Sequence, residues 1–90
     1  VDAVELVLGF PGNTLALTMH GDSLYTQSLR DPVLFAVGNE GAGISPVLQR
    51  AVNTCVSIPM AHQGVLALES LNAAAATAIA LFECQRQRFT

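Results

Sequence analysis

The sequence predicts an α/β domain with a mostly parallel sheet and flanking helices. One observation is a continuous apolar run at residues 33–37, of the kind that forms a strand buried on both faces. Another is an alanine-rich segment, from about residue 71 to residue 86, with apolar side chains at helical spacing. Strand and helix patterns also alternate along the 90 residues, which is typical of parallel sheets.

The first half of the chain is expected to hold a helix and two strands. Residues 2–10 have the apolar pattern of the end of a helix, and Pro and Gly within residues 11–13 break it. Residues 14–19 partly alternate polar with apolar side chains, which indicates a short strand, and a loop is expected at 20–22. Residues 33–37 are then expected to form a central strand.

The second half is expected to alternate helix, strand and helix. Ser45 and Pro46 suit a helix start, because Ser caps free backbone amides and Pro is tolerated at the first helical position. Residues 55–58 indicate a short strand that Pro59 ends. The side chains expected to face inward are Val47, Leu48, Ala51 and Val52 in the first helix, and Leu71, Ala75, Ala78, Ile79 and Phe82 in the last. Those expected to face a partner are Ala76, Ala80 and Leu81.

The composition argues against some classes of function for this chain by itself. The formal net charge is −3, and all four basic residues are Arg. A surface that contacts the phosphate backbone of a nucleic acid needs clustered Lys and Arg, so the chain alone is not expected to bind nucleic acid. No apolar stretch is long enough to span a bilayer. The hydrophobic fraction of 51% is high for a short chain and predicts apolar surface that a missing segment or a partner covers.

The cysteines and histidines suggest no metal site. Cys55 and Cys84 are too few and too far apart for a disulfide framework, so we expect reduced thiols in a cytoplasmic protein. His20 and His62 are isolated from other metal-binding side chains, and neither is assigned a role.

A glycine-rich segment at residues 38–43 directly follows the apolar run, where α/β proteins place their ligands. Glycine lets backbone amides approach a ligand closely. The segment matches neither the dinucleotide fingerprint nor a P-loop. A tight turn explains the glycines, and Asn39 is a good loop former. A turn does not need the carboxylate of Glu40, which is therefore a candidate to hold a catalytic side chain or orient a ribose.

The start of the last helix is a second candidate site. Ser70 suits the N-cap position, which is enough to explain its presence, while a helix N-terminus also favours anionic groups. Asn72 is harder to explain in the first turn, because Asn is a mediocre helix former. Its amide is therefore a candidate ligand-holding group.

Two segments resemble sequence motifs of the SpoU/TrmH class of SPOUT RNA methyltransferases. The second motif of that class is similar to residues 37–45, and the third motif is similar to residues 69–76. The two segments occur in the family's order and are joined by residues 56–60. The resemblance covers roughly residues 34–83. It implies an α/β-knot fold, with residues 1–90 as a single partial domain from the C-terminal portion of the methyltransferase domain. It also implies methyl transfer from S-adenosylmethionine to a ribose 2′-hydroxyl of rRNA or tRNA.

The resemblance implies roles for individual residues. Glu40 and Asn72 match functional positions of the family and are the expected catalytic residues. The strand end at residues 58–60 is expected to line the adenosine pocket and offer main-chain groups to adenine. The residues expected to bind the cofactor are Val37, Gly38, Asn39, Gly41, Gly43, Ile58, Pro59, Met60, Leu66, Ser70 and Leu71. The family is dimeric, so a homodimer is expected, through a surface that includes the last helix.

One motif of the family is missing. The first motif carries an Asn and a catalytic Arg and has no counterpart here, so the chain is expected to be the cofactor-binding half and inactive alone. A non-catalytic SPOUT-like module for nucleotide binding or dimerisation is the alternative, and an unrelated nucleotide-binding α/β domain is a third interpretation. An Asn followed within a turn or two by an Arg, upstream of Val1, would favour the enzyme.

Overall fold

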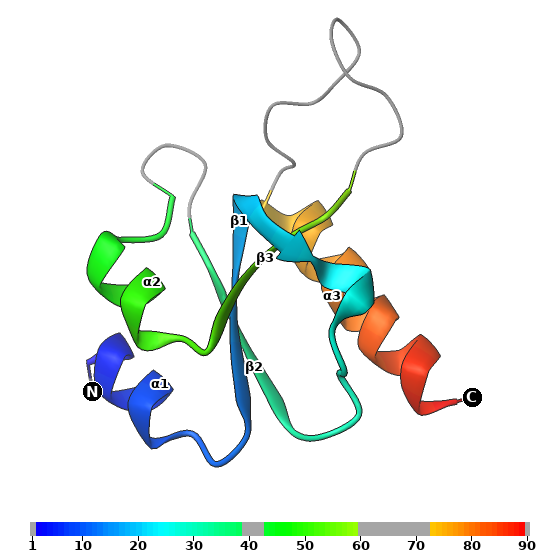
Figure 1. Cartoon of the computed structure of the whole chain (residues 1–90), viewed down its shortest axis with the longest axis horizontal. Coiled ribbons are helices and arrows are strands. Elements are labelled where there is room, and N and C mark those ends of the chain that lie inside the picture. The colour runs from blue at the N-terminus through cyan, green and yellow to red at the C-terminus, as the bar shows by residue number, and fades with distance from the viewer. Residues whose placement is uncertain (1, 39–42, 60–72, 90) are drawn as a thin grey trace, which may run out of the picture.

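The computed structural model describes residues 2–38, 43–59 and 73–89 (Figure 1). The elements in chain order are α1 (Ala3–Gly9), β1 (Asn13–Ser23), the 3-10 helix η1 (Leu24–Thr26), β2 (Val33–Val37), α2 (Pro46–Ala51), β3 (Thr54–Ser57) and α3 (Ala73–Arg88). In the described part of the chain, three strands form one sheet in the order β2-β1-β3, and both pairings are parallel. The predicted α/β domain with a mostly parallel sheet is confirmed.

Helices cover the two faces of this sheet. Helix α1 packs on α2 at one side, and α3 lies at the other (Figure 1). Leu15 and Ala16 are neighbours in β1 and are both fully buried, because successive strand residues point to opposite faces. Leu15 packs in one core cluster with Ala80 of α3, and Ala16 packs in a second cluster with Val7 of α1. The sheet is therefore the middle layer between two small cores.

The central strand is β1, so the prediction that residues 33–37 form a central strand is wrong. Ala16 pairs with Ala36 on one side and with Cys55 on the other, which leaves β2 at the edge of the described sheet. Three of the five β2 residues are only partly buried. The apolar run misled the prediction because helices on both faces of a sheet also demand apolar residues on an edge strand.

Strand β1 is also longer than predicted, and the loop expected at residues 20–22 is part of it. The strand continues to Ser23 through an irregularity at which Leu17 and Asp22 both pair with Val56. A Cβ atom on Gly21 would lie 2.5 Å from the carbonyl oxygen of Cys55, so this close approach requires glycine. The Gly-Asp pair therefore marks a bulge and not a loop.

The predicted start of α2 is confirmed. The Ser45 side chain accepts a hydrogen bond from the Leu48 amide at 3.2 Å, and Pro46 occupies the first turn. The inward set is only partly right, because Val52 is buried whereas Val47 is 53% exposed. A helix of six residues has room for one short apolar face, and Leu48 and Ala51 already occupy it beside the core.

Helix α3 is rotated relative to the prediction. Ala76 and Ala80, expected to face a partner, are buried, whereas Ala75, Ala78 and Phe82, expected to face the sheet, are exposed. Ile79 packs against the core as predicted, and Leu71 lies outside the described residues. Apolar spacing misled this assignment because the first turns of the helix are apolar on every side.

Polar contacts near the end of α3 indicate which face is buried. Glu83 is 3% exposed and accepts hydrogen bonds from Arg86 at 2.8 Å and from Gln87 at 2.9 Å. The Gln87 side chain also donates to the carbonyl of Gln27 and accepts from the amide of Leu29. The two Gln87 contacts with Gln27 and Leu29 fasten the helix to the segment before β2, and a rotation about the helix axis would break them.

This arrangement predicts a pH dependence of stability. Hydrogen bonds from Arg86 lower the pKa of Glu83 from 4.5 to about 2. Because the folded-state pKa lies below the unfolded one, the stabilisation is present above about pH 4.5 and is lost as the pH falls toward 2. Glu83→Gln should cost about 1–3 kcal/mol at neutral pH and flatten the dependence between these values. Chemical denaturation at each pH measures this, with exposed Glu5→Gln as control. Parallel curves for wild type and Glu83→Gln would contradict it.

Candidate functional site

The carboxyl ends of the three described strands meet at one edge of the sheet. Leu17 of β1 pairs with Val37 of β2 on one side and with Val56 of β3 on the other. Gly38 directly follows β2, and Ile58 directly follows β3. Because the strands are parallel, these two segments lie at the same edge with β1 between them, and ligands of α/β proteins bind at such edges.

A tight backbone contact closes the base of the glycine-rich segment. A Cβ atom on Gly38 would lie 2.2 Å from the carbonyl carbon of Gly43 and 2.6 Å from the amide nitrogen of Ile44. Gly43 has φ of +69°, a conformation that other residues rarely adopt. Both glycines are therefore explained by backbone geometry. The neighbouring Ile44 is 7% exposed and anchors the segment in the core beside α2.

The other side of the edge offers main-chain groups. The Ile58 side chain is partly buried and packs against the core on the α3 side. A ligand at the edge would therefore meet the Ile58 backbone and the exposed ring of Pro59. Val37 adds a side chain that is 36% exposed. An apolar wall with backbone donors and acceptors suits a flat heterocycle.

The structure thus brings Val37, Gly38, Gly43, Ile58 and Pro59 to one edge. The other residues predicted at the site lie outside the described residues: Asn39, Glu40, Gly41, Met60, Leu66, Ser70, Leu71 and Asn72. Their roles, including both catalytic assignments, stay predictions. The expected knot depends on the path from β3 to α3 through residues 60–72, which also lie outside the described part.

Sequence reasoning assigned no role to one segment at this edge. Residues 18–21 of β1 follow Leu17 directly and reach the carboxyl edge beside β3, and Asp22 beyond them pairs with Val56 of β3. They were expected to end a short strand and begin a loop. Their place at this edge follows from the position of β1 at the centre of the sheet, which the apolar pattern alone does not reveal.

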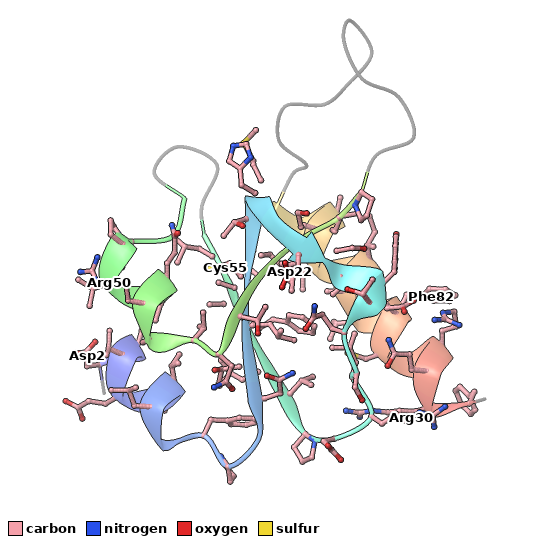
Figure 2. The ribbon with its side chains drawn as sticks, in the orientation of Figure 1. Asp2, Asp22, Arg30, Arg50, Cys55 and Phe82 are labelled. Carbon is pink, nitrogen blue, oxygen red and sulfur yellow. The ribbon has the colours of Figure 1, made fainter. Side chains whose placement is uncertain are left out.

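The arginines of the described residues lie elsewhere. Arg86 is paired with Glu83, and Arg88 donates hydrogen bonds to the carbonyls of Leu29 and Asp31. Figure 2 shows Arg50 on α2 and Arg30 near the C-terminal end of α3. In residues 2–38, 43–59 and 73–89, no three His, Cys, Asp or Glu side chains are grouped to hold a metal ion. No helix within these ranges is long and apolar enough to cross a membrane.

Comparison with known proteins identifies the family. Residues 4–82 match the profile described as the SpoU rRNA Methylase family. The chain belongs to this family. Over 65 residues it is 42% identical to a 23S rRNA (guanosine-2′-O-)-methyltransferase, RlmB, of Shewanella oneidensis, a match that covers 72% of this chain and 25% of the relative. The RlmB of Ralstonia nicotianae is 38% identical, with 72% and 24% covered. The SpoU chain thus spans about a quarter of the length of these relatives.

Solved structures agree with this assignment. The SpoU methyltransferase AviRb from Streptomyces viridochromogenes, in complex with the cofactor AdoMet, is 36% identical with a TM-score of 0.76; the match covers 90% of this chain and 31% of that one. A structure described as an RNA 2′-O ribose methyltransferase is 32% identical with a TM-score of 0.79, covering 97% and 33%. The resemblance to SpoU-class SPOUT enzymes is therefore confirmed, and the SpoU chain has the α/β fold it implied.

Proposed function

We propose that the protein is an S-adenosylmethionine-dependent RNA ribose 2′-O-methyltransferase, and that this chain is its cofactor-binding half. One observation carries the proposal: the backbone contact between Gly38 and Gly43 and the carboxyl end of β3 lie at the same edge of the sheet. Family membership supports the class of reaction. The AdoMet complex of AviRb, a related structure, supports the cofactor.

The chemistry of the described residues at this edge suits this cofactor. Adenine is flat and apolar on its faces and has hydrogen-bonding groups at its edge, which suits a site of main-chain groups between Gly38 and Ile58. Because Gly38 has no Cβ atom, the backbone of Gly43 can lie against it. Backbone amides of this segment are then proposed to line the ligand. S-adenosylmethionine supplies an electrophilic methyl group when bound. The chain's own task is to hold that group in line with a ribose hydroxyl.

The group that helps to activate the ribose hydroxyl is not expected in this chain. The family motif that carries the catalytic Arg has no counterpart in it, and the arginines Arg86 and Arg88 are engaged at α3. Glu40 is proposed to hold a catalytic side chain or the substrate ribose, and Asn72 is proposed to hold a ligand or to pin the loop of the expected knot. We therefore propose that the chain needs the rest of the protein for turnover.

Incubation of the intact protein with methyl-labelled S-adenosylmethionine and rRNA or tRNA tests the proposal. Digestion to nucleosides should show the label on a ribose 2′-oxygen. Label on a base would contradict the reaction. Absence of label while the protein still binds S-adenosylhomocysteine would favour the non-catalytic module instead.

We also propose that the protein is a homodimer through the outward face of α3. Phe82 is 67% exposed and Leu81 is 57% exposed, and the exposed Ala75 and Ala78 continue the apolar surface toward the start of the helix. An apolar surface along a helix opposite its buried face is typical of an interface. The sequence predicts a homodimer through a surface that includes this helix. The residues proposed to contact the partner are revised, because Ala76 and Ala80 are buried.

Leu81→Glu is expected to weaken the dimer by at least tenfold and to leave the unfolding temperature of the monomer within a few degrees. The reason is that an exposed side chain contributes little to the fold, whereas a charge at an apolar interface is costly. Light scattering at tens of micromolar measures the association. Leu8→Glu is the matched control, because Leu8 is 69% exposed on α1. A well-folded wild-type monomer at this concentration would refute the dimer.

A further inference from the structure

The bulge in β1 brings His20 to the candidate cofactor edge. Leu17 and Asp22 both pair with Val56, so residues 18–21 have no pairing position of their own on β3. Bulges re-aim side chains and are common next to active sites. Figure 1 shows β1 bending at this point and crossing the end of β3. His20 lies within the bend.

The neighbours of His20 hold its backbone in place. The Thr18 hydroxyl donates to the carbonyl of His20 and, at 3.5 Å, to that of Val56. The Ser57 hydroxyl donates to the carbonyl of Gly21 at 3.2 Å. Gly21 approaches the Cys55 carbonyl so closely that no side chain fits there. The bulge is therefore fastened on both sides to the strand that ends at the cofactor edge.

These contacts involve the backbone carbonyls of His20 and Gly21, and they do not use the His20 side chain. The hydroxyls of Thr18 and Ser57 are used within the bulge. The His20 residue is exposed, and within the described ranges no side chain or backbone group forms a hydrogen bond with its imidazole. Met19 beside it is 57% exposed and adds an apolar surface. An exposed imidazole that can donate and accept therefore directly follows an exposed apolar residue in the chain.

We propose that His20 contacts the RNA nucleotide that receives the methyl group, with Met19 packing against that nucleotide. This inference rests on the proposed function. The acceptor ribose must lie in line with the cofactor methyl group, so the RNA must reach the same edge of the sheet. Sequence-specific RNA contacts commonly combine stacking or apolar packing with hydrogen bonds to a splayed nucleotide, and the His20–Met19 pair offers both.

Steady-state methyl transfer by the intact protein tests this assignment. His20→Ala should raise the KM for RNA about tenfold, the effect of one lost hydrogen bond in a binding site. The affinity for S-adenosylhomocysteine should stay within about twofold, because adenine meets the Gly38 and Ile58 segments. His20→Asn should recover part of the loss, since the amide also donates and accepts. A merely structural role for His20 would instead lower the unfolding temperature and weaken both ligands together.

Exposed Glu5→Ala on α1 is the control variant and should leave both constants unchanged. An unchanged KM for RNA in His20→Ala, with wild type active, would overturn the assignment and leave the proposed function standing. A wild-type protein that transfers no methyl group would overturn the proposed function, and the assignment of His20 with it.

Discussion

Gly38→Ala is expected to weaken S-adenosylhomocysteine binding by at least a hundredfold. A methyl group at this position would lie 2.2 Å from the Gly43 carbonyl carbon and 2.5 Å from its oxygen, and both neighbours are backbone atoms that cannot rotate away. The segment would have to move by more than an ångström, which displaces the amides proposed to line the cofactor. Isothermal titration calorimetry on the purified protein measures the change.

The variant should remain folded, because Gly38 lies outside both core clusters, and overpacking of this kind costs about 1–3 kcal/mol. Gly9→Ala is the matched control, since a Cβ atom on Gly9 would meet nothing within 4 Å. Its affinity should equal that of wild type. A folded Gly38→Ala protein with normal affinity would place the cofactor somewhere else.

Glu40→Ala and Asn72→Ala are each expected to lower methyl transfer by about a hundredfold or more in the intact protein, the usual cost of losing a positioned polar group in an active site. The fold should persist, because neither polar side chain is predicted from the sequence to pack in the core. Single-turnover rates measure the effect. Exposed Glu5→Ala and Gln85→Ala supply matched carboxylate and amide controls. Near-normal turnover in either test variant would reduce that residue to a structural role.

Local signals in the sequence predicted most of the elements. Ser45 and Pro46 placed the start of α2, since capping depends on a few neighbouring atoms. The apolar run at residues 33–37 became β2, and the alanine-rich segment became α3. The glycine-rich segment was correctly assigned to the end of a strand, because that assignment needed only its neighbours in sequence.

Tertiary relations were harder to predict. Which strand is central depends on partners far along the chain, and an apolar edge strand covered on both faces reads like a central one. The buried face of α3 follows from Gln87, which bonds the distant residues Gln27 and Leu29 and also donates to buried Glu83, and apolar spacing does not reveal these contacts. The β1 bulge has the Gly-Asp composition of a turn, so His20 was taken for an isolated loop residue.

Calorimetric titration of S-adenosylhomocysteine into the purified wild-type protein tests the central claim most directly. S-adenosylhomocysteine is the form of the cofactor that remains after methyl transfer and has no methyl group to give. The heat therefore reports binding at the Gly38–Gly43 and Ile58–Pro59 edge without turnover. We expect saturable binding at one site per chain, with a Kd below about 100 μM, a range that calorimetry resolves at tens of micromolar protein. A folded protein that releases no heat and shows no thermal stabilisation at millimolar ligand would contradict the assignment of this chain as a cofactor-binding half.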